Sequence, residues 1–77
     1  MIVEIYSRPN CGYCTMAKQL ATAKGCEVKY YNLGVDFGTK EMFELFPGAR
    51  TFPQIILDGE KIGGYTELEK ILNASTT

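Results

Sequence analysis

Apolar residues recur along the chain first in a pattern typical of a β-strand and then at the spacing of an α-helix. The places where one pattern gives way to the other predict the strands and helices. Residues 2–6, IVEIY, form a β-branched and aromatic run that is typical of a buried strand, and residues 7–10 interrupt it. From Tyr13 the apolar residues return at helical spacing as far as Gly25, a natural C-terminal stop. The chain is therefore predicted to begin with a strand and a helix.

The same alternation of periods is repeated in the middle of the chain. Residues 26–33, CEVKYYNL, alternate well enough to form a second strand. Residues 36–46 return to helical spacing through Met42, Phe43 and Phe46, and we expect these three side chains to form the core face of a second helix.

The last third of the chain predicts a hairpin and a helix. Residues 53–57 read as a third strand, and Asp58-Gly59 is a strong two-residue turn into a fourth, antiparallel strand that starts at residues 60–62. Residues 66–69, TELE, form a capping-box pattern that opens a final helix. Residues 73–77 are expected to be a frayed tail.

The predicted order β-α-β-α-β-β-α describes one domain over residues 1–77. A right-handed first crossover makes the first two strands parallel, and the hairpin completes a four-stranded mixed sheet flanked by three helices. The fold class is therefore α/β. In such a sheet, the loop after the first strand lies at the carboxyl end of a strand and at a helix N-terminus, which is a favoured place for chemistry.

Composition narrows the function. The formal net charge is −1 and no basic stripe appears, so nucleic acid and anionic membranes are not expected as partners. No apolar run approaches the length of a bilayer span, and the first residues do not have the pattern of a targeting segment. We therefore expect a cytoplasmic protein.

The cysteines limit the chemistry further. Three cysteines cannot all pair within one molecule, which favours a reducing compartment over a secreted disulfide framework. The chain has no histidine, so Cys-His catalysis and mixed Cys/His zinc sites are excluded. Cys26 follows a helix-ending glycine, and we interpret it as a small buried apolar residue rather than a second redox centre.

The strongest candidate site is the C-x-x-C pair in RPNCGYC, on the turn from the first strand into the first helix. A helix N-terminus stabilises a thiolate, and the thiolate is the reactive form of cysteine. Cys11 is therefore predicted to attack and Cys14, one helical turn later, to resolve the mixed disulfide. Arg8 adds positive charge, Gly12 allows a tight turn, and Tyr13 is expected to project outward. The alternative is half of a metal knuckle that needs ligands from another chain.

RPNCGYC and TFPQIILDGEKIGGYTELE, in this order, resemble the dithiol glutaredoxins over essentially the whole chain, in the compact form of bacterial or phage members. The resemblance implies a minimal thioredoxin fold and a glutathione-dependent thiol-disulfide oxidoreductase. Such an enzyme reduces protein disulfides and glutathione mixed disulfides, and serves electron transport in cell redox homeostasis. The implied catalytic residues are Cys11 and Cys14.

The resemblance also implies a glutathione site. Residues 51–53, TFP, match the family's Thr-Val-Pro segment, in which the proline follows a cis bond and the preceding residue pairs with the main chain of glutathione; Phe52 departs from the usual valine. Residues 64–67 match the segment that receives the γ-glutamyl end, and Glu67, in place of the usual aspartate, is expected to meet the ammonium group. The residues assigned to glutathione are Arg8, Tyr13, Thr51, Phe52, Pro53, Gly64, Tyr65, Thr66 and Glu67.

Two alternatives stay open within this resemblance. Gly12 replaces the proline of the commonest motif, CPYC, and family members with a small residue there hold a [2Fe–2S] cluster between two subunits, which would make Cys11 an iron ligand. Glutaredoxin-like proteins that thioredoxin reductase reduces directly are the other alternative, although the TFP and GGYTE segments favour glutathione. We expect a monomer whose partners are glutathione and disulfide-containing proteins, with ribonucleotide reductase implied by the resemblance alone.

Overall fold

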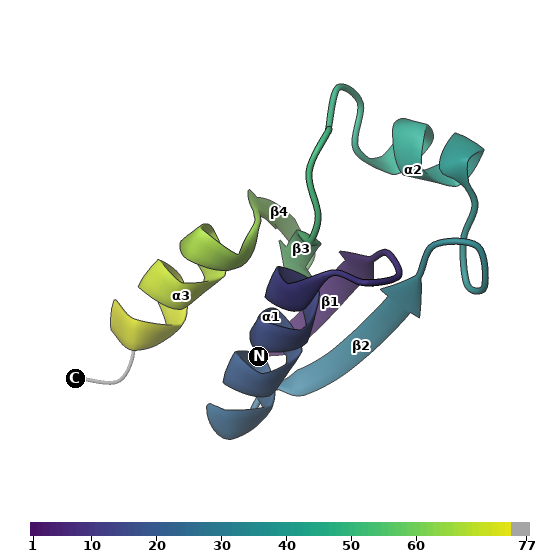
Figure 1. Cartoon of the computed structure of the whole chain (residues 1–77). Coiled ribbons are helices and arrows are strands. Elements are labelled where there is room, and N and C mark those ends of the chain that lie inside the picture. The colour runs from purple at the N-terminus through teal and green to yellow at the C-terminus, as the bar shows by residue number, and fades with distance from the viewer. Residues whose placement is uncertain (75–77) are drawn as a thin grey trace.

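The computed structural model describes residues 1–74 of the 77-residue chain. Its elements follow the predicted order β-α-β-α-β-β-α (Figure 1). In chain order they are β1 (Ile2–Ser7), α1 (Gly12–Ala23), β2 (Glu27–Asn32), α2 (Thr39–Leu45), β3 (Gln54–Leu57), β4 (Glu60–Gly63) and α3 (Tyr65–Ala74). Within residues 1–74, none of the helices has the length and apolar character needed to cross a membrane.

The four strands form one mixed sheet in the order β2-β1-β3-β4. The strand β1 is central, parallel to β2 and antiparallel to β3, and its Ile5 lies opposite Tyr30 on β2 and Ile55 on β3. The hairpin of β3 and β4 is antiparallel, as its Asp58-Gly59 turn predicts. This is the predicted α/β arrangement, and it brings the loop after β1 to the carboxyl end of the central strand.

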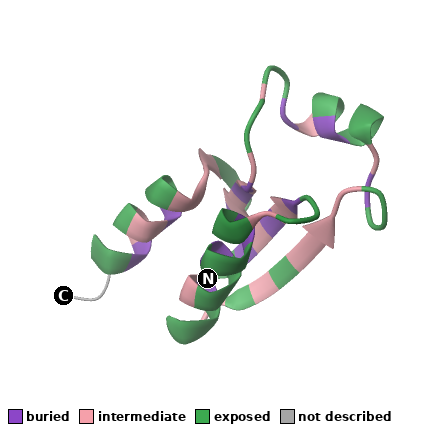
Figure 2. Cartoon of the chain, in the orientation of Figure 1, coloured by how far each residue is buried: buried purple, intermediate pink, exposed green. Residues whose placement is uncertain are grey.

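One face of the sheet is covered by α1 and α3. Alternate residues of the two central strands point to this face and are buried against both helices, as Figure 2 marks in purple. The core consists of Val3, Ile5, Ala17, Ala21, Ile55, Leu57, Leu68 and Leu72. Its members are 8% exposed or less, so α1 and α3 are fixed on the sheet by apolar burial.

The opposite face carries a second, more aromatic cluster. Phe37, Met42 and Phe46 are buried there against the half-buried Tyr6. The Tyr6 ring makes edge-to-face contacts with Phe37 and Phe46, each with ring centroids 5.2 Å apart. The Lys61 ammonium group of β4 donates to the Leu45 carbonyl at the end of α2. These side chains attach α2 to the sheet, although Figure 1 shows its ribbon set apart from α1 and α3.

The second helix differs from its prediction in two respects. It begins at Thr39 rather than at residue 36, because the Asp36 carboxylate accepts the Asn32 N–H at 2.8 Å and holds the preceding segment in a loop. The prediction that Phe43 belongs to the core face is also wrong. Met42 is buried while Phe43 is 61% exposed, since adjacent helical positions cannot both face the sheet.

The final helix also corrects the sequence prediction. It begins at Tyr65, and the Gly64 carbonyl accepts the Leu68 N–H at 3.1 Å, so the predicted capping box at residues 66–69 is wrong. The helix continues through Ala74, so the expected tail is wrong for residues 73 and 74, and residues 75–77 lie outside the described part of the chain. Cys26 lies just before β2, half-buried against the first core, which is less buried than predicted.

Candidate active site

The two cysteines of RPNCGYC form a disulfide at the start of α1. The chain leaves β1, turns through Asn10, whose φ of 59° lies in the left-handed region that asparagine tolerates, and enters the helix at Gly12. Cys11 is the N-cap residue, and Cys14 is in the first turn with its Cα 5.3 Å away. The predicted pairing across one helical turn is therefore confirmed.

The environment of the disulfide distinguishes its two sulfurs. The Cys14 N–H donates to Cys11 Sγ at 3.2 Å, and no acidic residue occupies the first turn of α1. This backbone amide has no acceptor within the helix, and both its hydrogen bond and the positive end of the helix dipole favour negative charge on Cys11 Sγ. Cys14 is fully buried, whereas Cys11 is half-buried, so a thiol from outside reaches Cys11. The geometry thus favours attack at Cys11 and resolution by Cys14.

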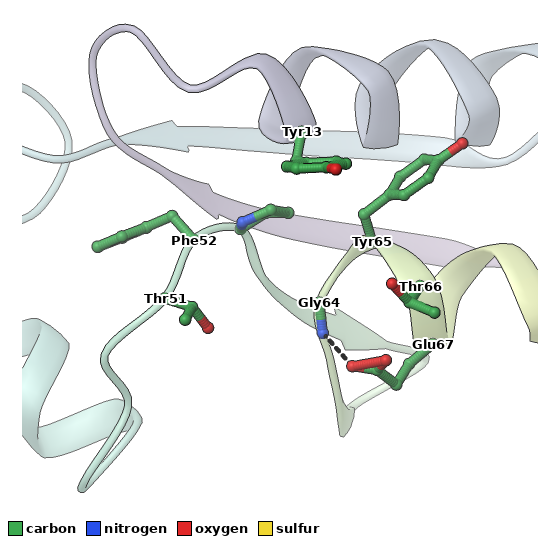
Figure 3. Close-up of a pocket in the computed structure, with 8 residues that line it drawn as sticks. Tyr13, Thr51, Phe52, Gly64, Tyr65, Thr66 and Glu67 are labelled. Carbon is green, nitrogen blue, oxygen red and sulfur yellow. Dashed lines mark hydrogen bonds between the residues drawn. The ribbon is translucent and has the colours of Figure 1, made fainter.

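A pocket of about 200 Å³ lies beside the disulfide turn. It is built from the first turn of α1, the loop before β3 and the start of α3 (Figure 3). Its lining residues are Tyr13, Thr51, Phe52, Pro53, Gly64, Tyr65, Thr66 and Glu67. Each of them is a residue that the sequence assigns to glutathione. The structure therefore gathers into one pocket three segments that are far apart in the sequence.

The loop before β3 forms one border of the pocket. The Phe52-Pro53 peptide bond is cis, as the resemblance implies, and Pro53 is buried. The Phe52 side chain packs against the aromatic cluster beside α2, and Figure 3 shows it directed away from Tyr13 and Tyr65. Because the ring is used in that cluster, the pocket receives mainly the backbone of this segment. The departure from valine at this position therefore adds bulk outside the pocket.

The start of α3 forms the opposite border. The Gly64 N–H donates to Glu67 Oε1 at 3.0 Å, drawn as a dashed line in Figure 3. Gly63 has a φ of 113°, which favours glycine, and a Cβ built there would also lie 2.6 Å from Glu67 Oε1 and displace that side chain. The Glu67 carboxylate therefore already holds one backbone amide of the pocket, and its role toward a ligand's ammonium group stays a prediction.

Tyr65 makes a contact that the sequence analysis missed. Its hydroxyl donates to Glu69 Oε2 at 3.0 Å, and its ring centroid is 5.9 Å from that of Tyr13. This hydrogen bond raises the pKa of Tyr65, because a phenolate would lose the bond and lie beside a carboxylate. The spacing of four residues on a helix is the sequence signal that could have identified the pair.

Arg8 lies on another side of the disulfide turn. It lines a wider hollow of about 550 Å³ together with Cys11, Asn10 and Asn32. Its guanidinium carbon is 5.9 Å from the centroid of the Phe52 ring. Of the residues assigned to glutathione, Arg8 is the one that does not line the smaller pocket, although its guanidinium lies near Phe52, which does.

Comparison with known proteins identifies this arrangement. The family model Glutaredoxin matches residues 3–62. The chain belongs to the glutaredoxin family. Its relatives in this family are thiol-disulfide oxidoreductases, and its α/β architecture is the thioredoxin fold of glutaredoxins.

Individual relatives agree with the family assignment. Glutaredoxin 3 of Escherichia coli (strain K12) is 38% identical over 68 residues, which cover 86% of this chain and 80% of that protein. The crystal structure of glutaredoxin 1 from Francisella tularensis complexed with cacodylate has a TM-score of 0.73 at 32% identity, covering 94% of this chain and 96% of that one. Hybrid peroxiredoxin hyPrx5 of Haemophilus influenzae is 37% identical over 68 residues, but the chain spans only 28% of its length.

Proposed function

We propose that this glutaredoxin is a glutathione-dependent oxidoreductase that reduces protein disulfides and glutathione mixed disulfides through Cys11 and Cys14. The observation that carries the proposal is the position of the dithiol: a half-buried Cys11 at the start of α1, a fully buried Cys14 beneath it, and a pocket beginning at the intervening Tyr13. Membership of the glutaredoxin family indicates the reaction type. The pocket beside the disulfide turn favours a reductant that is a small peptide thiol.

The reaction begins from the reduced dithiol. The Cys11 thiolate attacks one sulfur of the substrate disulfide, forms a mixed disulfide and releases the other substrate sulfur as a thiolate. The Cys14 thiolate then attacks Cys11 Sγ and releases the second substrate thiolate. The Cys11–Cys14 disulfide that remains is the state of the structure described above.

Two glutathione molecules restore the dithiol. The first glutathione thiolate attacks Cys11 Sγ, and Cys14 leaves as a thiolate. The second attacks the sulfur of the bound glutathionyl group, so that glutathione disulfide leaves and the Cys11 thiolate is regenerated. For a glutathione mixed disulfide as substrate, only the Cys11 steps are needed. The electrons thus pass from two glutathione thiols to one substrate disulfide.

The surroundings favour these steps in distinct ways. The Cys14 N–H, which donates to Cys11 Sγ at 3.2 Å, stabilises negative charge on the attacking sulfur. The loop of Phe52 and Pro53 offers backbone to the peptide of glutathione, and the start of α3 offers amides to its γ-glutamyl carboxylate. Arg8, which lines the hollow shared with Cys11, is positioned to meet a carboxylate on that other side.

The experiment is reduction of a small mixed disulfide by the purified protein with two alternative electron sources. We expect turnover with glutathione and glutathione reductase and none with thioredoxin reductase. Turnover with thioredoxin reductase alone would contradict the proposal and would make the glutathione assignment of the pocket wrong. It would then support the alternative of a redoxin that thioredoxin reductase reduces directly.

The [2Fe–2S] cluster stays a prediction. Among residues 1–74, no group of three or more cysteine, aspartate or glutamate side chains could hold a metal ion, so a cluster would need ligands from a second subunit and from glutathione. A Cβ added at Gly12 would meet nothing within 4 Å, so nothing within this subunit requires a small residue there, and any such requirement would come from the second subunit. Anaerobic reconstitution with iron, sulfide and glutathione tests this: a visible absorption band supports a cluster, and a colourless monomer contradicts it.

The proposal extends to the partners and the location of the protein. Glutathione and disulfide-containing proteins are the proposed partners, and ribonucleotide reductase is a candidate substrate by family resemblance. A cytoplasmic location is proposed because the odd number of cysteines leaves Cys26 as a free thiol, which a reducing compartment preserves. A monomer is proposed as the working form of the dithiol enzyme, in contrast to the dimer that a shared cluster would need.

A further inference from the structure

One wall of the pocket consists of two tyrosines from different helices. Tyr13 projects from the first turn of α1 and Tyr65 begins α3, and Figure 3 shows both side chains at the upper edge of the pocket. Their ring centroids are 5.9 Å apart and their planes meet at 36°. Tyr13 is 62% exposed, so burial does not fix this ring. The wall therefore depends on what holds Tyr65.

Tyr65 is half-buried, with its side chain packed against the first core, and its hydroxyl is held by Glu69, a residue outside the pocket lining. The Tyr65 hydroxyl donates to Glu69 Oε2 at 3.0 Å, and Glu69 is itself half-buried one helical turn further along α3. Side chains four residues apart are neighbours on a helix, and a hydrogen bond to a carboxylate is stronger than one to a neutral acceptor. This bond keeps the Tyr65 ring against the side of its own helix, beside Tyr13.

We propose that Glu69 is a positioning residue of the glutathione pocket: by holding the Tyr65 hydroxyl, it keeps the Tyr65 ring beside Tyr13 as a fixed wall for a glutathionyl group. The wall offers aromatic faces to the methylene and peptide groups of the ligand, between the disulfide turn and the start of α3. A wall that is already in place spares the ligand the entropy cost of ordering a loose ring. This inference rests on the proposed function and names a residue that acts on the same pocket.

The primary experiment measures KM and kcat for a glutathionylated peptide with glutathione as reductant. Glu69→Ala releases the Tyr65 hydroxyl and lets the outer part of the ring move away from Tyr13, so KM should rise about fivefold to tenfold while kcat stays within about twofold. Glu69→Gln retains an oxygen acceptor and should raise KM less. Glu44→Ala is the matched control, because it removes the same charge from an exposed position on α2 and should leave KM unchanged.

A double-mutant cycle separates positioning from a general structural effect. Tyr65→Phe removes the hydroxyl on which Glu69 acts, so adding Glu69→Ala to this variant should raise KM no further. A tyrosine titration followed by NMR, which separates the five phenols of the chain, tests the hydrogen bond directly: the raised pKa of Tyr65 should fall toward its ordinary value in Glu69→Ala. The inference would be overturned if Glu69→Ala left KM unchanged. It would also be overturned if adding Glu69→Ala to the Tyr65→Phe variant raised KM as much as it does in the wild type.

The wild-type protein separates the failure of this inference from failure of the proposed function. If the wild type shows no glutathione-dependent turnover, both are wrong. If it turns over with glutathione while Glu69→Ala has the same KM, only the inference is wrong. Stoichiometric reduction of a peptide disulfide without glutathione, by protein previously reduced with dithiothreitol, should be equal in all the Glu69 variants, since Cys11 and Cys14 are untouched.

Discussion

The two helices that border the active site begin with different caps. At the start of α1 a sulfur accepts the backbone amide, from the Cys14 N–H to Cys11 Sγ at 3.2 Å. At the start of α3 a carboxylate does so, from the Gly64 N–H to Glu67 Oε1 at 3.0 Å. The sulfur is the reacting atom and its charge changes during the reaction, whereas the carboxylate takes no part in the exchange. One helix start is therefore built for chemistry and the other for the shape of the pocket.

The N-terminal ends of α1 and α3 also differ in how much free space surrounds them. Apart from its chain neighbours and the backbone of its own helix, a Cβ added at Gly12 would have no heavy atom within 4 Å, whereas one added at Gly63 would lie 2.6 Å from Glu67 Oε1. The open start leaves Cys11 accessible to a large disulfide substrate. The crowded start holds the Gly64 amide in place at the edge of the pocket.

The largest expected effect follows from the sulfur cap. Cys11→Ser should abolish thiol-disulfide exchange with protein disulfides and with glutathione mixed disulfides, because a serine hydroxyl cannot form the mixed disulfide. Cys14→Ser should lose only the reduction of protein disulfides, since the intramolecular resolving thiol is missing. The measurement is turnover of each variant with both substrates and glutathione as reductant.

Cys26→Ser is the control for this pair. The residue is a half-buried free thiol remote from the disulfide turn in sequence, and its loss should leave both activities in place. A Cys11→Ser protein that still reduced glutathione mixed disulfides would show that the two caps do not differ as described.

A smaller effect is expected at the crowded start. Gly63→Ala introduces a side chain at a φ of 113° and against the Glu67 carboxylate. It should lower the free energy of unfolding by about 1–3 kcal/mol and raise KM for a glutathionylated peptide, since the backbone is strained at this φ and the Glu67 side chain must move away from the Gly64 N–H. Urea unfolding measures the first effect and steady-state kinetics the second.

Gly12→Ala is the matched glycine substitution at the open start. With no neighbour within 4 Å and no positive φ, it should leave the free energy of unfolding unchanged or slightly higher. Equal losses in the two alanine variants would remove the distinction between an open and a crowded helix start.

The smallest effect concerns the charge of the carboxylate cap. Glu67→Gln retains an oxygen that can accept the Gly64 N–H but loses the favourable interaction with the helix dipole, so unfolding should become easier by about 0.3–1 kcal/mol. Added salt should reduce this difference, because the position is exposed. Glu44→Gln, in the last turn of α2, should cause no loss, and a loss as large as that of Glu67→Gln would indicate a general charge effect.

The order and type of the elements could be predicted because each combines a clear period with a clear stop. The second helix was the exception, since Met42 and Phe43 both fit helical spacing to Phe46 and only packing shows which one faces the sheet. Its start was predicted too early because the sequence does not reveal that Asp36 accepts the Asn32 N–H.

The pocket residues could be predicted because they lie in two contiguous motifs whose order along the chain is diagnostic. The sequence could not show that Arg8 lies on another side of the disulfide turn, since that depends on the packing of its guanidinium near Phe52. The spacing of Tyr65 and Glu69 on one helix makes their contact possible, but only the orientation of the Tyr65 side chain shows that its hydroxyl bonds to Glu69.

The complete burial of Cys14 has a kinetic consequence. Because its sulfur is closed to solvent, every reactant that enters the cycle must do so through Cys11, and substrate and reductant cannot occupy that sulfur together. The enzyme should therefore follow ping-pong kinetics, with parallel lines in double-reciprocal plots when substrate and glutathione are varied against each other. A single accessible sulfur thus imposes a strict sequence on the two half-reactions.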